Sequence, residues 1–281
     1  MSAPGAPRSP RFPMGLARLQ GEAAACAQRE TTGAQREPLR PQRLVREAAR
    51  DAARHVAPTG LGLDSALVRH RMVQRLRAEG LCGEPVLTAM ASVPRHLFID
   101  SALAAQAYED TSLPIGHGQT ISKPSVVARM LGLLSQGMAA RERGDLGRVL
   151  EIGTGCGYQA ALLVALAPAV ISIERLRALH CRAREQLAEL IGERLLLIHA
   201  DGIMGHAAAA PYQSIVAAAG GDALPAAWLA QLAPGGRLVA PMRQPGGQAQ
   251  ALMVVDKDRH GVLHQQVRDG VRFVPLKSGT I

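Results

Sequence analysis

Residues 151–159 read EIGTGCGYQ, and this short stretch indicates the fold class. It overlaps the end of an apolar segment, residues 148–152, and leads into a second apolar segment that begins at Tyr158. Its glycines at positions 153, 155 and 157 form a GxGxG pattern, which suits a sharp turn between a strand and a helix. Glycine has no Cβ atom, so a ligand can approach the backbone of such a turn closely. The stretch therefore predicts a strand, a ligand-binding turn and a helix.

The segments that follow this turn extend the pattern into an α/β fold. Continuous apolar strands that alternate with helices are typical of a parallel sheet covered on both faces. Strands are predicted at residues 148–152, 169–174, 194–201, 212–219 and 237–242, and helices at residues 158–168, 176–192 and 224–236. Three later segments predict antiparallel edge strands, at residues 251–258, 262–270 and 271–276. We therefore expect a doubly wound, mostly parallel sheet with antiparallel edge strands.

The chain before this sheet predicts a helical addition and one unusual loop. Helices are expected at residues 64–79, with Asp64 as N-cap, and at residues 84–93, 99–107 and 124–136. The loop before the last helix, PIGHGQTISKPS at residues 114–125, carries hydroxyls, a histidine and a lysine where a plain connector would need only turn residues. We expect a single domain over residues 63–281, made of the helices and loop (63–147), the central strands and helices (148–242) and the edge strands (243–281).

Residues 1–62 are expected to form a basic, mostly disordered extension, because they show little apolar periodicity. The first 60 residues hold ten arginines and five acidic residues, so they carry more than half of the net charge of +9. Charge gathered in one solvated segment is weak evidence for a nucleic-acid partner. Stacking on bases also needs aromatic side chains, and the chain has only three Tyr, three Phe and one Trp. No nucleic-acid partner is therefore expected.

The four cysteines and the hydropathy pattern favour a cytoplasmic protein. The cysteines show no CxxC spacing, so we expect reduced thiols and no metal site. No apolar run approaches the roughly 20 residues that a membrane span needs, and the N-terminus lacks the pattern of a secretory signal.

Three signals at the ends of successive strands indicate the ligand. The dinucleotide pattern GxGxxG would need glycine at position 158, where the chain has Tyr158. Glu174 ends the second strand, where a carboxylate can accept hydrogen bonds from ribose hydroxyls. Asp201 and Gly202 follow the third strand, where a carboxylate could accept from an adenine amine. Taken alone, Glu174 could be a helix-start acid and Asp201 a turn residue. Together they predict S-adenosylmethionine, a nucleoside ligand without a diphosphate.

Six stretches of the chain resemble the protein-L-isoaspartate O-methyltransferase family over about residues 66–279. They are LPIGHGQTIS (113–122), VLEIGTGCGYQ (149–159), ISIER (171–175), ADG (200–202), LAPGGRLVAPM (232–242) and VRFVPL (271–276). The resemblance implies a Rossmann-like class I methyltransferase domain. It also implies methyl transfer from S-adenosylmethionine to the free carboxyl of L-isoaspartyl residues in damaged proteins, which is a repair reaction. We expect a monomer that uses no metal.

The resemblance also implies roles for individual residues. Ser122 matches the active-site residue of the family, and Thr120 and Ile121 would line the same substrate site. The expected cofactor residues are Glu151, Gly153, Gly155, Gly157, Glu174, Asp201 and Gly202. From the residues alone, Ser122 is first explained as an ordinary N-cap of the helix that follows it, and it could serve both roles.

Two departures from the family pattern keep alternatives open. Gln213 occupies a position that is commonly aspartate, and AAGGD at residues 218–222 replaces a common Thr-Ala-Ala-Pro stretch, in a region expected near the methionine end of the cofactor. The alternatives are another S-adenosylmethionine-dependent methyltransferase, such as one acting on nucleic-acid bases, and a non-catalytic adenosylmethionine-binding module. An NAD-dependent oxidoreductase is disfavoured by Tyr158.

Overall fold

The computed structural model describes residues 66–190, 192, 194–244 and 246–281. The predicted extension, residues 1–62, and the predicted N-cap Asp64 lie outside these described residues. Among the described residues, no helix combines the length and apolar character that crossing a membrane requires.

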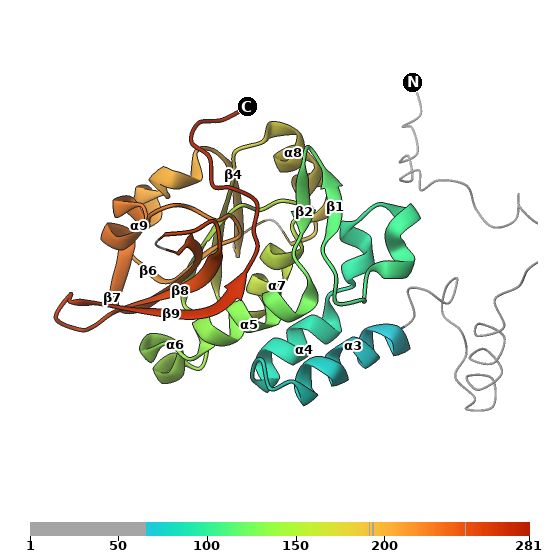
Figure 1. Cartoon of the computed structure of the whole chain (residues 1–281), viewed down its shortest axis with the longest axis horizontal. Coiled ribbons are helices and arrows are strands. Elements are labelled where there is room, and N and C mark those ends of the chain that lie inside the picture. The colour runs from blue at the N-terminus through green and yellow to red at the C-terminus, as the bar shows by residue number, and fades with distance from the viewer. Residues whose placement is uncertain (1–65, 191, 193, 245) are drawn as a thin grey trace, which may run out of the picture. The chain divides into compact units, whose positions relative to one another are not determined.

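The centre of the described chain is a seven-stranded sheet in the order β5-β4-β3-β6-β7-β8-β9. Its strands β4 and β6 to β9 are labelled in Figure 1. Its strands are β3 (Arg148–Ile152), β4 (Ala169–Glu174), β5 (Leu195–His199), β6 (Tyr212–Ala217), β7 (Leu232–Arg243), β8 (Gln250–Lys257) and β9 (Leu263–Val271). Strands β3 to β7 are parallel, whereas β8 and β9 add antiparallel pairs at one edge. The chain runs outward from β3 to β5 and then returns to pair β6 with β3. The order of the strands therefore reverses between β3 and β6, and a doubly wound sheet binds ligands at the carboxyl ends of its strands at such a switch point. The predicted fold class is confirmed.

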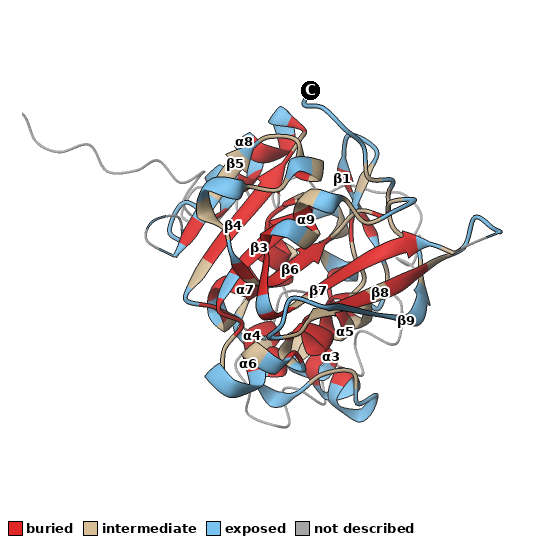
Figure 2. Ribbon diagram, turned by 90° about the vertical axis from the view of Figure 1, so that its left-hand side faces the viewer, coloured by how far each residue is buried: buried red, intermediate tan, exposed pale blue. Residues whose placement is uncertain are grey.

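Apolar residues cover both faces of the sheet. Within β3, Val149 belongs to one buried cluster, while Leu150 and Ile152 belong to the other. Figure 2 shows the central strands in the colour of buried residues and the edge strand β9 largely in that of exposed ones. The alternation of side chains along a strand explains how one short apolar segment serves two layers.

The helices pack around this sheet. They are α3 (Ala66–Ala78), α4 (Glu84–Ser92), α5 (Pro124–Ser135), α6 (Met138–Arg143), α7 (Tyr158–Leu166), α8 (Arg177–Gln186) and α9 (Ala226–Gln231). Helices α3 and α4 pack on each other and on α5, and α4 also packs on α7 (Figure 1). Every residue of α7 from Tyr158 to Val164 is buried, because the helix lies between the sheet and this helical addition. The N-terminal helical addition thus covers the helix that follows the glycine turn.

Three predicted helices differ from the structure. Residues 99–107 do not form an α-helix; the short 3₁₀ helix η2 (Ser101–Gln106), capped by the Asp100 side chain, lies there, and another, η1 (Arg95–Phe98), precedes it. Helix α8 ends at Gln186 instead of residue 192, and α9 ends at Gln231 instead of residue 236. Helix α9 stops early because Pro234 and Gly235, with its φ of +78°, cannot continue a helix, and the LAPGG stretch begins β7.

The third predicted edge strand is also wrong. Residues 271–276 leave the sheet after Val271 and cross beyond the carboxyl end of β6. There the Gly220 amide donates to the Val274 carbonyl at 2.8 Å, and the Leu276 amide donates to the Gly220 carbonyl at 2.8 Å. Pro275 lacks the N–H that a continued ladder would need, and the segment forms only an isolated bridge with Gly220. The C-terminal segment is thereby brought to the ligand-binding end of the sheet.

Candidate active site

The predicted loop is a small antiparallel hairpin of β1 (Leu113–Gly116) and β2 (Gln119–Ile121). Its turn is held by three consecutive left-handed residues, with φ values of +91° at Gly116, +54° at His117 and +68° at Gly118. Leu113 pairs with Ile121, and both side chains are buried. Because side chains alternate along a strand, Thr120 and Ser122 belong to the opposite face.

A pocket lies where this hairpin faces the carboxyl ends of β3, β4 and β6. Seven of the predicted site residues line it: Thr120, Ile121 and Ser122 from the hairpin, and Gly153, Gly155, Glu174 and Gly202 from the strand ends. Glu151, Gly157 and Asp201 do not line the pocket and stand behind its wall. The structure therefore brings most, but not all, of the predicted residues to one cavity.

The glycine turn adopts the backbone that its sequence predicted. Gly153, Gly155 and Gly157 have φ values of +91°, +57° and +91°, which side chains with a Cβ atom rarely adopt. A Cβ atom on Gly157 would lie 2.7 Å from a methyl carbon of Leu187, so this glycine is also required for packing. Gly157 thus packs against Leu187 on the side of the turn away from the pocket, whereas Gly153 and Gly155 line the pocket.

Glu174 braces the glycine turn and faces the pocket. One carboxylate oxygen accepts a hydrogen bond from the Gly155 amide at 2.9 Å, and the other accepts from the Leu176 amide at 2.9 Å. A carboxylate has about four lone-pair directions, so each oxygen keeps acceptor capacity after these bonds. The side chain is 5% exposed and lines the pocket, so this capacity is available to a ligand with hydroxyl donors.

Glu151 lies beneath the turn and is fully buried. Its carboxyl accepts hydrogen bonds from Gln159 Nε2 at 3.0 Å and from the Ser172 hydroxyl. Burial raises the pKa of Glu151 to about 8, although these two hydrogen bonds act in the opposite direction. Gln159 lines the pocket while Glu151 does not, so the structure places the predicted cofactor residue Glu151 behind the pocket wall.

Both carboxylate oxygens of Asp201 accept hydrogen bonds from backbone amides. One carboxylate oxygen accepts from the Ile203 amide at 2.9 Å, capping the short 3₁₀ helix η3 (Gly202–Met204). The other accepts from the Gly279 amide at 2.7 Å, at the end of the chain. Its neighbour Gly202 lines the pocket, and a Cβ atom there would lie 2.6 Å from a methyl carbon of Ile152. The structure thus places Asp201 behind the pocket as an anchor for the C-terminal segment.

The C-terminal segment forms a wall of the pocket that the sequence reasoning missed. Leu276, Lys277 and Ile281 line the cavity. The Ile281 amide donates to the Arg175 carbonyl at 3.0 Å, and the Arg177 amide donates to the Ile281 carbonyl at 2.7 Å. These two hydrogen bonds therefore hold the segment next to the carboxyl end of β4. No local sequence pattern signals this contact, because its partners lie about a hundred residues apart.

The two departures from the family pattern, at Gln213 and at residues 218–222, lie at opposite ends of β6 and have separate roles. Gln213 stands at the amino end of β6, where its side-chain oxygen accepts from the Arg148 amide at 2.8 Å. The prediction that Gln213 lies near the cofactor is therefore wrong, because the pocket is at the opposite end of the strand. Ala218 and Ala219 do line the pocket, and Gly220 holds the C-terminal segment.

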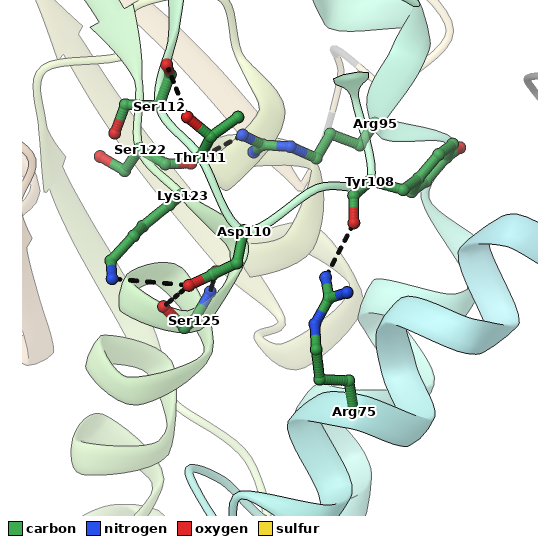
Figure 3. Close-up of polar contacts among 9 residues, drawn as sticks. All are labelled: Arg75, Arg95, Tyr108, Asp110, Thr111, Ser112, Ser122, Lys123 and Ser125. Atoms are coloured by element: carbon green, nitrogen blue, oxygen red, sulfur yellow. Dashed lines mark hydrogen bonds and ion pairs between the residues drawn. The ribbon is translucent and has the colours of Figure 1, made fainter. Parts of the chain in front are cut away.

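Ser122 is not the N-cap of the helix that follows it. Helix α5 begins at Pro124 with Lys123 as N-cap, and no side chain caps it from that position. Asp110 instead accepts hydrogen bonds from both the amide and the hydroxyl of Ser125 at 2.8 Å and lies 3.5 Å from the Lys123 ammonium (Figure 3). The capping explanation of Ser122 is therefore wrong, since a remote carboxylate performs that task.

The Ser122 side chain lies where the pocket meets an adjoining groove. Both cavities are lined by Thr120 and Ser122, and the groove continues over Ser112, Lys123, Arg272 and Phe273. Figure 3 shows the Ser122 hydroxyl pointing away from the Arg95 guanidinium, which contacts the Ser122 carbonyl. A hydroxyl at this junction can contact molecules bound on either side.

Cys156 is the thiol of the glycine turn. It is buried and lines the pocket, and burial raises the pKa of its thiol. The thiolate is the nucleophilic form of cysteine, so this side chain is a packing residue at neutral pH. Among the described residues, no group of three or more His, Cys, Asp and Glu side chains is placed to hold a metal ion.

Comparison with known proteins identifies the family of the chain. The family model for protein-L-isoaspartate(D-aspartate) O-methyltransferase matches residues 68–280. A protein-L-isoaspartate O-methyltransferase of Leptothrix cholodnii is 57% identical over 280 residues, covering 100% of this chain and 98% of the relative. One of Methylibium petroleiphilum is 57% identical over 242 residues, covering 86% of this chain and 89% of the relative.

Solved structures agree with this sequence comparison. A structure of a protein-L-isoaspartate O-methyltransferase superimposes with a TM-score of 0.66 at 25% identity, covering 75% of this chain and 66% of that chain. A putative protein-L-isoaspartate O-methyltransferase from Plasmodium falciparum, in complex with S-adenosyl-L-homocysteine, shares the fold with a TM-score of 0.64 at 22% identity, covering 74% and 98% of the two chains. This chain belongs to the protein-L-isoaspartate(D-aspartate) O-methyltransferase family.

Proposed function

We propose that this chain repairs damaged proteins by moving a methyl group from S-adenosylmethionine to the free carboxyl of L-isoaspartyl residues, with Ser122 orienting that carboxyl. Membership of the family supports the reaction. The observation that carries the role of Ser122 is its position at the junction of the pocket and the adjoining groove, with its hydroxyl not used to cap α5. The groove would take the peptide and the pocket the cofactor.

The residues of the pocket fit S-adenosylmethionine. Glu174 would accept hydrogen bonds from the ribose hydroxyls, since both of its oxygens keep acceptor capacity and the side chain lines the pocket. The backbone of Gly153 and Gly155 would allow the ligand to approach closely, and Gly202 would lie at its edge. The cofactor supplies a methyl group made electrophilic by a positively charged sulfur. Asp201 would contribute indirectly, by holding Gly279 and the C-terminal wall.

The reaction needs alignment more than it needs a base. An isoaspartyl carboxyl, with an ordinary pKa of about 4, is ionised at neutral pH and is already the nucleophile. The site must hold its oxygen in line with the methyl carbon and sulfur and exclude water. Ser122 would donate a hydrogen bond that fixes the carboxylate, with Thr120 and Ile121 lining the same place. The backbone amide nitrogen then attacks the methyl ester and releases methanol, which closes a succinimide whose hydrolysis returns some normal aspartate.

A matched pair of peptides tests this proposal. The protein is incubated with methyl-labelled S-adenosylmethionine and with two peptides that differ only in an isoaspartyl or an aspartyl residue. We expect base-labile label in the isoaspartyl peptide and little in its twin, because the groove must recognise a displaced backbone. Equal labelling of both peptides would contradict the repair function. Binding of S-adenosylhomocysteine without labelling of either peptide would favour a non-catalytic binding module.

The same proposal covers the setting of the reaction. We propose a monomer that acts on cytoplasmic proteins and does not bind nucleic acid, with its methyltransferase domain in residues 63–281. The three Tyr, three Phe and one Trp of the whole chain are few for stacking on bases. Light scattering during size-exclusion chromatography of the full chain tests the monomer.

A further inference from the structure

Arg95 is a fully buried arginine, 0% exposed, in the 3₁₀ helix η1. Its Nε donates a hydrogen bond to the Ala107 carbonyl at 2.8 Å, and its Nη2 donates to the Ser122 carbonyl at 2.8 Å. Its guanidinium carbon lies 5.0 Å from the centre of the Tyr158 ring. Nη1 has no hydrogen-bond partner among the described residues. The guanidinium is thus held by two backbone carbonyls and one aromatic face.

Stability alone explains this side chain poorly. Burying a charge costs free energy unless a partner of opposite charge compensates, and no carboxylate of the described chain forms a salt bridge with Arg95. An apolar side chain of similar volume often stabilises such a place equally well or better. What an apolar residue could not do is hold two particular carbonyl oxygens in fixed positions. The contacts of Arg95 therefore indicate a geometric task.

Those contacts join three segments that surround the site. Ala107 follows η2 on the way to the hairpin, Ser122 follows β2, and Tyr158 is the first residue of α7 after the glycine turn. Ser122 and Tyr158 both line the pocket. In Figure 3 the Arg95 side chain reaches the Ser122 carbonyl from one side, while the Ser122 hydroxyl points to the other. Holding the carbonyl thus fixes the backbone from which the Ser122 side chain projects.

A second contact holds the residues just after Ser122. Asp110 binds the amide and hydroxyl of Ser125 at the start of α5 (Figure 3). Arg95 and Asp110 therefore fix opposite ends of the short stretch from Ser122 to Ser125. Without Arg95, Asp110 would still cap the helix, but the Ser122 peptide would lose its own anchor.

We propose that Arg95 is a positioning residue that fixes the Ser122 backbone so that the Ser122 hydroxyl meets the substrate carboxylate in the geometry of methyl transfer. The inference rests on the proposed role of Ser122. Arg95 does not line the pocket, so it acts through Ser122 and not by contact with the substrate. The expected defect is therefore in turnover, and cofactor affinity should change little.

Three variants of the full chain test the proposal. Arg95→Met keeps an unbranched side chain but removes the guanidinium with both donors, and Arg95→Lys keeps a charge but cannot hold both carbonyls in the same fork. Arg75→Met is the matched control, because Arg75 donates to the Tyr108 carbonyl at 2.9 Å from the neighbouring α3 and does not contact Ser122 (Figure 3). For each variant, kcat and KM for the isoaspartyl peptide, the Kd for S-adenosylhomocysteine, the melting temperature and amide hydrogen exchange over residues 119–126 are measured.

We expect Arg95→Met to lower kcat by about ten- to a hundredfold, the scale that a small misplacement of a reacting group produces. KM and the Kd for S-adenosylhomocysteine should change by less than about threefold, since the contacts of the strand ends remain. Amide exchange over residues 119–126 should become faster in the folded protein. Arg95→Lys should fall between wild type and Arg95→Met. Arg75→Met should lower the melting temperature while kcat and the exchange of residues 119–126 stay near wild type.

Two results would overturn the proposal: a folded Arg95→Met variant with normal kcat and normal exchange, or an Arg75→Met variant with the same loss of kcat. If Arg95→Met does not fold, Arg95→Lys decides, because normal kcat and exchange in that variant would equally contradict a geometric role. The failure of the proposed function is a separate result. A wild-type chain that does not label the isoaspartyl peptide would refute the reaction, while the exchange data would still show whether Arg95 holds the loop.

Discussion

At the scale of single residues, Ser122→Ala separates the chemistry of the site from its stability. Asp110, and not Ser122, caps α5, so the free energy of unfolding should change by no more than about 0.5 kcal/mol. The kcat/KM for the isoaspartyl peptide should fall by roughly ten- to a thousandfold, as expected for the loss of one hydrogen-bond donor to a reacting oxygen. Steady-state kinetics and urea unfolding measure the two effects.

Asp110→Ala is the matched control for Ser122→Ala, because it removes the cap and keeps the hydroxyl. It should cost about 1 kcal/mol of stability, the usual value of an N-cap. Near-normal turnover in a folded Ser122→Ala variant would contradict the proposed role of this hydroxyl and would leave alignment to the surrounding backbone.

Glu151 makes a second residue-scale prediction, on the dependence of stability on pH. Burial raises its pKa from 4.5 to about 8 in the folded chain, so the folded state keeps a proton that the unfolded state releases. The stabilisation linked to this proton is complete below the unfolded pKa and is lost as the pH rises through the folded pKa. Glu151→Gln carries no ionisable group and escapes this loss.

Thermal unfolding of wild type and Glu151→Gln at about pH 5 and about pH 8 measures this effect. The melting temperature of Glu151→Gln minus that of wild type should increase as the pH rises. Glu185→Gln, at an exposed position of α8, controls for the loss of a charge elsewhere. A melting-temperature difference between wild type and Glu151→Gln that is the same at both pH values would contradict the raised pKa.

Two carboxylates show which part of the site a sequence can predict. Glu174 stands beside its own glycine turn, so the local pattern placed it correctly at the pocket. Asp201 also ends a strand and has the same residue type, but the Gly279 amide occupies one of its oxygens. Gly279 lies 78 residues further along the chain, and no local pattern reports a partner at that distance. Patterns therefore predict residues whose partners are nearby and fail where a remote segment competes for them.

At the scale of elements, the C-terminal segment closes the pocket, and its removal should weaken cofactor binding. Deleting residues 277–281 removes Lys277 and Ile281 from the wall and frees Asp201. These residues are exposed and bury little apolar surface, so the melting temperature should fall by only a few degrees, about 1 kcal/mol. Calorimetry should show affinity for S-adenosylhomocysteine weakened by about 1–2 kcal/mol, the loss of one or two hydrogen bonds and some exclusion of water.

Two other results for the affinity of this truncated chain would contradict the prediction. Unchanged affinity would mean that the wall takes no part in binding, whereas tighter binding would mean that freed Asp201 holds the adenine directly, as the sequence suggested. Asp201→Asn in the full chain distinguishes these cases, because it weakens the anchor of Gly279 without removing the wall.

The predicted boundaries of helices and strands agree with the structure only where the local sequence signals are strong. Strands β3 and β4 coincide with their predicted ranges because each is a continuous apolar run bounded by polar or turn residues. Helix α9 was predicted too long, because LAPGG was interpreted as a helix end when it is the start of β7. A glycine pair marks the end of a helix and the start of a bulged strand equally well, and pairing with β6 decides between them.

At the scale of the whole molecule, the alternation of apolar strands and helices was sufficient to predict the doubly wound sheet, because continuous apolar strands joined by helices are typical of a parallel sheet covered on both faces. The path of the last segment was not predictable in this way. Residues 271–276 have the apolar content of a strand, yet they cross to Gly220 at the ligand-binding end. Whether a segment extends an edge or covers a pocket depends on surface that the rest of the fold leaves open.

The last prediction concerns where the folding unit begins. Deleting residues 1–62 should leave kcat and the melting temperature nearly unchanged, because their sequence offers little periodic apolar surface to bury. Deleting residues 1–79 also removes α3, whose Met72, Val73 and Leu76 lie in the core. Each large buried side chain is worth about 2–5 kcal/mol, and three of them together approach the roughly 5–15 kcal/mol that stabilises a whole domain. The longer deletion should therefore not fold, as circular dichroism and thermal unfolding would show. A large loss of stability in the shorter deletion would instead place part of the extension in the domain.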